Sequence, residues 1–286
     1  MNTGGLIFAY NSRDVDYAVT AIIAGGLAKK HLNIPFSLIT DESTIEWMKE
    51  SKVWDKANEV FENFILTDRP ANYNSRLLND GTHSSVVPFI NSGRSMAFDL
   101  SPYDKTLLID SDYLVFSNKL SKYLELDHSI MIGSAMNDIQ GERIGFLDKT
   151  VSDVGVHLLW ATTVIFTKDA ESKLFFNLVK HIEKNYQLFS DLYRYSPKQY
   201  RNDIAFSVAK HIIDGFETVL DDALPPILTV HDKDMLVGVS QDKLTFLITD
   251  INAPDKFVAC TVAGQDTHIM NKQSIIRHKN NLLELI

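Results

Sequence analysis

Residues 105–116 have the sequence Lys105-Thr-Leu-Leu-Ile-Asp110-Ser-Asp112-Tyr-Leu-Val-Phe116, in which an apolar run leads into two aspartates and a second apolar run follows. A short apolar run of this kind is typical of a buried strand in a parallel sheet. Residues i and i+2 of a strand point to the same side, so we expect the carboxylates of Asp110 and Asp112 to lie together. A divalent cation bound by both would relieve their repulsion. The stretch therefore predicts a metal site, although most Asp-x-Asp sequences are surface turns with solvated side chains.

The composition is that of an ordinary globular protein of 286 residues, with 45% hydrophobic and 23% charged residues. The net charge of −9 does not favour a broadly basic nucleic-acid surface, but it is compatible with a local basic groove. A single cysteine, Cys260, excludes an internal disulfide and a cysteine-rich zinc site. Neither a signal-peptide pattern nor an apolar stretch of about 18 residues is present. We therefore expect a soluble, cytoplasmic protein without membrane insertion.

Apolar runs and helical repeats alternate along the first third of the chain. Strands are predicted at 5–10, 36–40 and 60–66, with a helix at 15–32 and another beginning at Asp41. This alternation predicts an α/β fold with a mostly parallel central sheet flanked by crossover helices. Because ligands bind beyond the carboxyl ends of such strands, polar and aromatic residues there are candidate ligand-binding residues. They are Tyr10, Asn11, Asp14 and Asp41.

The rest of the chain continues this mixed pattern without a repeat or an interdomain linker, so we expect a single domain over residues 1–286. Long loops are predicted at 67–85 and 136–155. Further strands are expected at 129–135, 161–167, near Val219, and at 227–230, 244–249 and 257–262. Further helices are expected at 91–100, 169–189, 202–213 and from 273 onward.

Three separated pieces of the chain resemble one family. The first is Gly93-Arg-Ser-Met-Ala-Phe-Asp-Leu-Ser-Pro-Tyr-Asp-Lys-Thr-Leu-Leu-Ile-Asp110-Ser-Asp112, in which Arg94 lies sixteen positions before Asp110. The others are His268-Ile-Met-Asn271-Lys272 and Asn202-Asp203. Their order and spacing over most of residues 5–275 resemble the GT-A fold nucleotide-sugar glycosyltransferases, in particular the retaining family 8 group that includes glycogenin and bacterial galactosyltransferases.

The chain departs from the pattern of that family at several positions. The family usually has a lysine where Arg94 stands. Its late motif is His-x-x-Gly-x-x-Lys, whereas here Asn271 replaces the glycine and Lys272 comes early. Asn202-Asp203 stands in place of an Asp-Gln motif. The Asp-x-Asp block is therefore the part of the chain in which the resemblance is close.

The resemblance implies transfer of a sugar from a nucleotide sugar, UDP-linked in this family, to a hydroxyl acceptor with retention of configuration. Residues 1–117 would form a nucleotide-binding half, and residues 118–286 an acceptor half. Mn²⁺ or Mg²⁺ would neutralise the diphosphate leaving group, and an imidazole ligand would favour Mn²⁺. The implied metal ligands are Asp110, Asp112 and His268, with His231 as the alternative histidine.

The other implied site residues fall into two groups. Nucleotide-sugar binding is assigned to Tyr10, Asn11, Asp14, Asp41, Arg94, Ser111 and Lys272. Catalysis is assigned to Asp203, Asn202 and Arg94. Each group also has a structural interpretation, because aspartates at helix starts act as caps and cations on a surface form ordinary ion pairs.

Two other functions are compatible with an Asp-x-Asp pair. In haloacid-dehalogenase-type phosphatases one such aspartate is the nucleophile and the other the general acid, and Asp221-Asp222 would supply a late acidic pair. That motif normally lies on the first strand, and it has a threonine or valine where this chain has Leu114. The other alternative is a non-catalytic protein that binds a nucleotide sugar.

The acceptor remains open at the level of sequence. The block from His268 to Ile275 looks like transferases of large tailed phages, which implies a hydroxylated base in DNA as one acceptor and the host cytoplasm as the location. A saccharide, a lipid-linked sugar and a protein hydroxyl are equally compatible. The sequence does not indicate the oligomeric state.

Overall fold

The computed structural model describes the chain in eight stretches. These are residues 1–69, 75–79, 84–88, 93–141, 149–196, 199–217, 223–250 and 253–286. The strand expected near Val219 and the pair Asp221-Asp222 lie outside the described residues.

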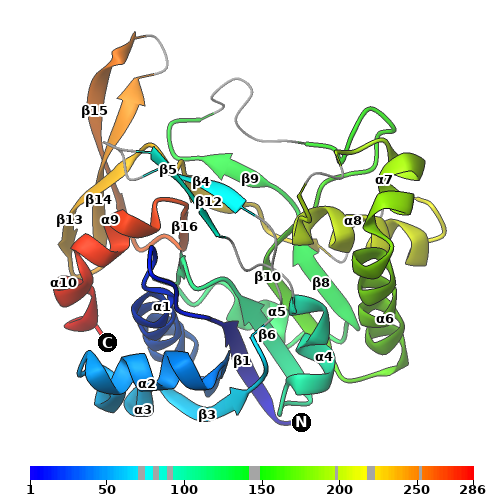
Figure 1. The fold of residues 1–286 in the computed structure, drawn as a ribbon, viewed down its shortest axis with the longest axis horizontal. Coiled ribbons are helices and arrows are strands. Elements are labelled where there is room, and N and C mark those ends of the chain that lie inside the picture. Colours follow the sequence, from blue (N-terminus) through cyan, green and yellow to red (C-terminus); the bar gives the residue numbers. More distant parts are fainter. Residues whose placement is uncertain are drawn as a thin grey trace.

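A seven-stranded sheet, in the order β11–β8–β10–β6–β1–β2–β3, forms the centre of the molecule (Figure 1). β10 runs antiparallel to both of its neighbours, and the other pairings are parallel. The expected mixed, mostly parallel α/β sheet is therefore confirmed. Its strands are β1 (Thr3–Phe8), β2 (Phe36–Thr40), β3 (Phe61–Leu66), β6 (Lys105–Ile109), β8 (Ile130–Gly133), β10 (Trp160–Thr167) and β11 (Ala223–Leu224).

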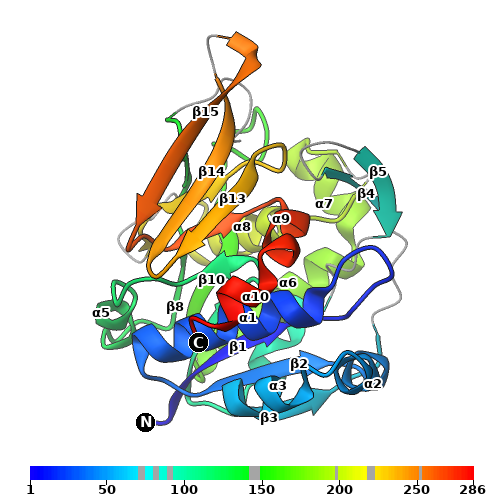
Figure 2. The ribbon, with the colours of Figure 1, turned by 90° about the vertical axis from the view of Figure 1, so that its left-hand side faces the viewer.

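Helix α1 (Tyr17–Leu32) is buried on nearly every side, which explains its almost wholly apolar sequence. It packs on β1 and β2 and also contacts the C-terminal helices (Figure 2). Gly25 and Gly26 allow this close packing: a Cβ atom on Gly26 would lie 2.5 Å from the side chain of Ile286, and one on Gly25 would lie 2.8 Å from Phe61. The early strand–helix–strand order is thus built around a core helix.

The remaining helices surround the sheet, and among the described residues none has the length and apolar character needed to cross a bilayer. α6 and α8 pack together through the aromatic rings of Phe175, Phe176 and Phe206. The helices are α2 (Glu42–Glu50), α3 (Trp54–Val60), the 3₁₀ turn η1 (Arg94–Met96), α4 (Ala97–Leu100), α5 (Ser121–Leu124), α6 (Ala170–Lys184), α7 (Tyr186–Tyr193), α8 (Asn202–Ile213), α9 (Lys272–Arg277) and α10 (Lys279–Leu283).

Within the described stretches there are three smaller sheets besides the central one. One has the order β7–β16–β12–β9, one is the meander β13–β14–β15, and one is the hairpin β4–β5. The meander projects from the body of the molecule (Figures 1 and 2). The strands are β4 (Ser75–Asn79), β5 (Ser84–Pro88), β7 (Tyr113–Leu114), β9 (Met136–Asp138), β12 (Ile227–Val230), β13 (Met235–Ser240), β14 (Lys243–Asp250), β15 (Ala253–Ala263) and β16 (Thr267–Ile269).

Three predicted elements were wrong in detail. The loops expected at 67–85 and 136–155 contain β4, the start of β5 and β9, all short strands whose pairing partners do not follow from local composition. The single helix expected at 169–189 is two helices, α6 and α7. Asn185 separates them with non-helical backbone angles (φ −114°, ψ 34°), and its side-chain amide donates a hydrogen bond to the carbonyl oxygen of His181 at 2.8 Å.

The expected helix cap at Asp14 was also wrong. Asp16 caps α1, because its Oδ1 atom accepts a hydrogen bond from the Val19 N–H at 3.0 Å. Asp14 is exposed, and its backbone carbonyl accepts a hydrogen bond from the Gln273 side chain at 2.5 Å. The loop after β1 is therefore tied to the start of α9.

Replacing Asp16 with asparagine should stabilise the protein above pH 6. Burial raises the pKa of Asp16 from 3.8 to about 6. Between these values the folded chain binds more protons at Asp16 than the unfolded chain, so this contribution to stability falls as pH rises. Asparagine keeps the cap, and after allowance for partial exposure we expect a gain of about 1 kcal/mol at pH 7.5. Urea unfolding of both proteins at pH 7.5 and pH 5 checks this.

The gain should shrink as the pH falls and vanish below pH 3.8, where the wild-type carboxyl group is mostly protonated in both states. Asp169→Asn at the start of α6, where Asp169 caps Ser172 in the same way, is the matched control for the cap itself. An equal gain at both pH values would contradict the prediction.

Candidate metal centre

Strand β6 delivers the two aspartates to the carboxyl edge of the central sheet. All five of its residues are buried, and the chain then turns before β7. The Asp110 N–H donates to the carbonyl oxygen of Thr162 at 3.0 Å, and the Tyr113 N–H donates to the carbonyl oxygen of Asp110 at 3.2 Å. Asp110 and Asp112 therefore lie in a turn, not within a strand as predicted. The turn still brings their carboxylates together.

His268 reaches this turn through pairing of strands distant in sequence. β16 pairs antiparallel with β7, which places His268 opposite Tyr113. The Ile269 N–H donates to the carbonyl oxygen of Asp112 at 2.9 Å. The Nε2 atom of His268 lies 3.4 Å from Oδ1 of Asp112. Asp266 strengthens the pairing, because its Oδ1 atom accepts hydrogen bonds of 2.8 Å from the backbone N–H groups that follow β7.

The three side chains have the donor set and spacing of a divalent-metal site. One ligand atom from each of Asp110, Asp112 and His268 lies within 4.8 Å of the others. Ligands of a six-coordinate ion with bonds of about 2.1 Å lie roughly 3.0 to 4.3 Å apart, so small side-chain adjustments suffice. Nδ1 of His268 is buried and has no hydrogen-bond partner among the described residues. The residues therefore fit a cation, and two carboxylates with an imidazole suit Mn²⁺.

Two cations neutralise the aspartates. Nη1 of Arg94 lies 2.5 Å from Oδ1 of Asp110, and Nζ of Lys272 donates a hydrogen bond to Oδ2 of Asp112. Burial opposes ionisation of Asp112, but Lys272 and His268 outweigh it and hold the pKa of Asp112 well below its usual range. Burial raises the pKa of Asp110, although Arg94 opposes the rise. Asp112 is thus the more firmly ionised of the two.

Arg94 has hydrogen-bonding capacity beyond its ion pair. Arg94 is 7% exposed, and its Nε and Nη2 atoms are buried without a hydrogen-bond partner among the described residues. Unsatisfied buried N–H donors are costly, and a guanidinium group favours anions that accept two hydrogen bonds. Arg94 is therefore equipped to bind an anionic group beside Asp110.

The start of helix α9 places Lys272 beside Asp112. Asn271 is fully buried and caps α9: its Oδ1 accepts from the Ser274 N–H at 3.0 Å, and its Nδ2 donates to the carbonyl oxygen of Asp234 at 2.8 Å. Lys272 is consequently the first residue of α9, directly beside Asp112. Asn271 therefore lets a lysine four positions after His268 reach the same site.

Asp203 lies near enough to the Asp110 turn to interact with Asp110 electrostatically. Its Oδ1 atom accepts a hydrogen bond from the Ala161 N–H at 2.9 Å, and its charge raises the pKa of Asp110. The irregular register of β10 between Trp160 and Val164 presents this N–H to α8. Asn202 and Asp203 form the first turn of α8, but Arg201 is the N-cap residue and makes no side-chain cap.

The four candidate residues after β1 and β2 are engaged in local contacts. The Tyr10 hydroxyl is 2.8 Å from Thr67 Oγ1, and Asn11 donates its backbone N–H to Thr44 at 2.8 Å. Asp41 caps α2, as expected, and also pairs with Arg69 at 2.5 Å. Burial opposes ionisation of Asp41, yet hydrogen bonds from Arg69 and Thr44 lower its pKa to about 2. No contact among the described residues links these four to the aspartate pair.

The structure separates the two candidate histidines. Nδ1 of His231 lies 2.6 Å from a carboxylate oxygen of Asp232 and accepts a hydrogen bond from the Lys233 N–H. His231 is absent from the metal-ligand group found among the described residues.

Ser111, expected beside the donor, is buried within the turn. Sequence reasoning did not single out Arg201, whose Nη2 atom lies 3.6 Å from Oδ2 of Asp203, although its position next to Asn202-Asp203 was a usable signal.

Comparisons with known proteins give structural matches alone. A scan against models of known protein families finds no match, and a search of curated proteins finds none either. The glycosyltransferase GlyE of Streptococcus pneumoniae TIGR4 is 13% identical, with a TM-score of 0.42, over 78% of this chain and 45% of that chain. An active-site mutant of LgtC is 14% identical, with a TM-score of 0.47, over 78% and 72% of the two chains.

A protein of different activity matches to a similar degree. The inositol-1-phosphate CTP transferase of T. maritima is 11% identical, with a TM-score of 0.41, over 79% of this chain and 85% of that chain. This chain also spans less than half of the length of GlyE. The function is therefore inferred from the geometry of the site.

Proposed function

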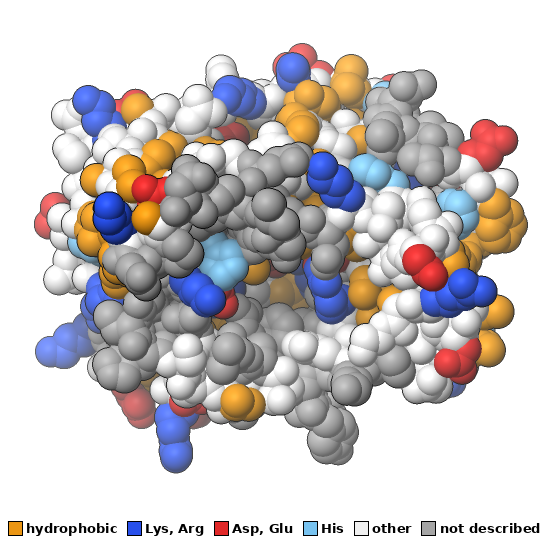
Figure 3. Space-filling view, turned by 90° about the horizontal axis from the view of Figure 1, so that it is seen from above, with side chains coloured by type: hydrophobic (Ala, Val, Ile, Leu, Met, Phe, Trp, Pro, Cys, Tyr) orange, Lys and Arg blue, Asp and Glu red, His pale blue; other side chains and the backbone are white. Residues whose placement is uncertain are grey.

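We propose that this chain is a metal-dependent glycosyltransferase that transfers a sugar from a nucleotide sugar, with UDP as the expected nucleotide, to a hydroxyl acceptor with retention. One observation carries the proposal: Asp110, Asp112 and His268 offer one metal-ligand atom each within 4.8 Å, and a buried cation lies on each carboxylate. The chain as a whole carries a net charge of −9, so the two cations Arg94 and Lys272 beside this carboxylate pair are a local feature and do not reflect a generally basic protein. Figure 3 shows Lys and Arg side chains and a histidine around the central hollow of one face.

The three ligands would serve a diphosphate leaving group. Bound Mn²⁺ would neutralise the negative charge that develops on the diphosphate as the glycosidic bond breaks. Asp112 and Asp110 would hold the ion through hard carboxylate oxygens, and His268 would add a nitrogen ligand that favours Mn²⁺ over Mg²⁺. Asp112 would be the principal ligand because Lys272 and His268 keep it ionised.

Arg94 and Lys272 would bind the donor phosphates once the carboxylates hold a cation. Each now balances one aspartate at short range. A metal ion bound to the two aspartates would supply the balancing positive charge, so the side chains of Arg94 and Lys272 would become available to phosphate oxygens. Arg94 would use its unpartnered Nε and Nη2 atoms, and Lys272 would act as a point charge.

Asp203 would contact the transferred sugar. Its Oδ1 atom is held by the Ala161 N–H, which fixes the carboxylate close enough to Asp110 to affect its pKa. A fixed carboxylate beside the breaking bond would accept hydrogen bonds from sugar hydroxyl groups and stabilise positive charge at the anomeric carbon. Asn202 would supply a neighbouring amide.

The geometry favours this function over a phosphatase. A phosphatase of the haloacid-dehalogenase type needs its second aspartate to donate a proton. Here the carboxylate of Asp112 lies against Lys272 and His268, which keep it ionised. An ionised carboxylate suits metal binding and opposes a general-acid role.

The direct test is release of UDP from UDP-glucose and UDP-galactose, each at ~1 mM, a concentration at or above typical KM values. The release is measured with Mn²⁺, with Mg²⁺ and with EDTA. We expect Mn²⁺-dependent release, accelerated by the correct acceptor. Phosphate release from p-nitrophenyl phosphate in the same buffers would instead support the phosphatase. A protein that binds UDP tightly but releases none from either sugar would be a binder without catalysis.

The choice of histidine gives a second prediction with an internal control. His268→Ala should weaken Mn²⁺ binding by at least about 10- to 100-fold, because it removes one of three protein ligands and loss of a residue that only supports a ligand already costs about that much. His231→Ala, which alters a histidine paired with Asp232, should leave the affinity within about twofold. Isothermal titration of both variants with Mn²⁺ measures this, and equal losses would contradict the assignment.

A further inference from the structure

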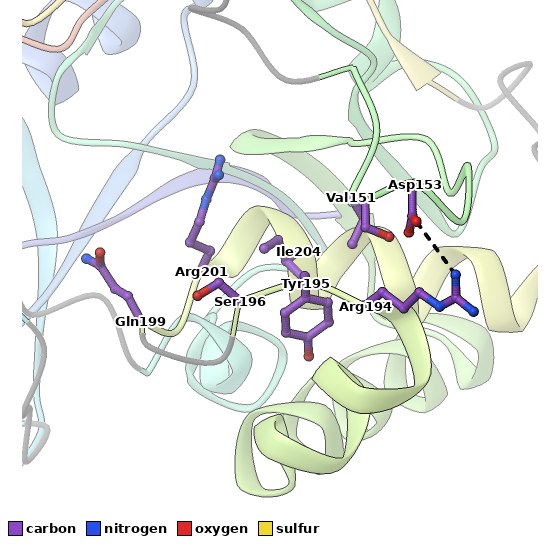
Figure 4. Close-up of a pocket in the computed structure, with 9 residues that line it drawn as sticks. Val151, Asp153, Arg194, Tyr195, Ser196, Gln199, Arg201 and Ile204 are labelled. Atoms are coloured by element: carbon purple, nitrogen blue, oxygen red, sulfur yellow. Dashed lines mark ion pairs between the residues drawn. The ribbon is translucent and has the colours of Figure 1, made fainter.

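A cavity lies near the candidate metal centre, and none of its described lining residues is assigned to donor binding. Its volume is about 590 Å³, within the range of small-molecule sites, and it lies between the segment after Thr150 and the start of α8. Arg194 and Asp153 lie on one side of it, 3.6 Å apart, and Gln199 and Arg201 lie on the other (Figure 4).

Arg201 forms the boundary between this cavity and the candidate metal centre. It lines the cavity, and its Nη2 atom lies 3.6 Å from Oδ2 of Asp203. Its guanidinium group lies over the Trp160 ring, 5.8 Å from the ring centroid. Trp160 and Ala161 begin the irregular part of β10, and Ala161 holds Asp203. A molecule in the cavity would therefore contact Arg201, which links the cavity to Asp203.

The lining chemistry matches a polyhydroxylated ligand. Among the described lining residues, Arg194, Arg201 and Asp153 give a formal charge of +1, which is not the charge of a strong anion site. The lining contains planar hydrogen-bonding groups on Arg194, Gln199 and Asp153. It also contains the hydroxyl group of Ser196 and the apolar side chain of Ile204. Sugars present adjacent hydroxyl groups that pair with planar amide, carboxylate and guanidinium groups, and C–H faces that pack on apolar surface.

We infer that this cavity is a saccharide-binding site that holds the acceptor of the proposed reaction, with Arg201 between the acceptor and Asp203. Saccharide binding follows from the cavity itself, whereas the role of that saccharide as acceptor rests on the proposed function. The cavity favours a saccharide over a base in DNA, because a duplex would require a broad cationic surface and the described lining residues carry one net positive charge.

The test measures saccharide binding without donor or metal. Saturation-transfer NMR is performed on the intact protein with lactose, maltose and methyl β-glucopyranoside as probes. We expect at least one to bind wild type in the millimolar range. Gln199→Trp, which fills the cavity, should weaken that binding at least tenfold. Gln187→Trp places the same side chain on the exposed surface of α7 and should leave it unchanged.

Circular dichroism and the melting temperature establish that the variants fold. Arg194→Leu is a second, exposed variant expected to weaken binding about threefold. Absence of binding by all three probes, or equal binding by wild type and folded Gln199→Trp, would overturn the inference. Because UDP release is measured separately, saccharide binding without UDP release would refute the proposed function alone, and UDP release without saccharide binding would refute this site alone.

Discussion

Asp112→Asn is expected to lower metal-dependent sugar transfer by about 10³-fold and to abolish thermal stabilisation by Mn²⁺. Both carboxylate oxygens of Asp112 face cationic or ligating partners, and its side chain is 3% exposed. The amide lacks the charge that holds a divalent ion, and loss of metal-assisted stabilisation worth about 4 kcal/mol corresponds to that factor.

The variant should still fold, because the asparagine oxygen can accept the hydrogen bond from Lys272. We expect a loss of about 1 to 2 kcal/mol in unfolding free energy, since a neutral acceptor replaces a charged one. UDP release and Mn²⁺-dependent melting are measured together, with Asp99→Asn on the exposed surface of α4 as the control. Wild-type activity in folded Asp112→Asn would refute the metal assignment.

Lys272→Met is expected to destabilise the metal-free protein by about 3 kcal/mol and to make its stability strongly dependent on Mn²⁺. The side chains of Lys272 and Asp112 are 9% and 3% exposed, so removing the ammonium leaves a buried carboxylate without its countercharge. A bound Mn²⁺ replaces that charge. Binding at 100 times the dissociation constant contributes about 2.7 kcal/mol, which would restore most of the loss.

The chain contains a matched control for this result. Lys210 and Asp214 form a comparably buried pair, with side chains 7% and 10% exposed and 2.5 Å between the charged atoms. Lys210→Met should cost a similar amount of stability, and Mn²⁺ should raise its stability only as much as it raises that of wild type, because no metal-ligand group among the described residues includes Asp214. Lys272→Met should gain more than wild type, and an equal gain in both variants would show that the ion does not replace the charge of Lys272.

The local elements around β6 followed from sequence because their causes are local. β1, β2 and β6 are short apolar runs bounded by polar turns, and burial on both faces of a parallel sheet requires such runs. The buried character of α1 follows in the same way from its apolar residues. Asp41 as a cap of α2 was also evident, since the cap interaction spans three residues.

Interactions between distant segments could not be predicted in this way. Asp16, not Asp14, caps α1, because neighbouring residues compete for a position that backbone geometry selects. The pairing of Asp41 with Arg69 and the cavity beside Arg201 each join segments whose approach depends on the packed sheet. The meander β13–β15 was seen in part, and its first strand was missed.

The aspartate pair illustrates the division between local pattern and packed fold. The apolar run before Asp110 specified a buried strand, and the Asp-x-Asp spacing specified two neighbouring carboxylates, since both properties depend on a few consecutive residues. Packing then added what no local pattern contains. The β7–β16 pairing brought His268 to Asp112, the cap at Asn271 turned Lys272 toward the same carboxylate, and the turn after β6 placed Asp110 against Arg94. Two carboxylates that repel each other become a candidate metal site because long-range strand pairing places a histidine and two cations around them.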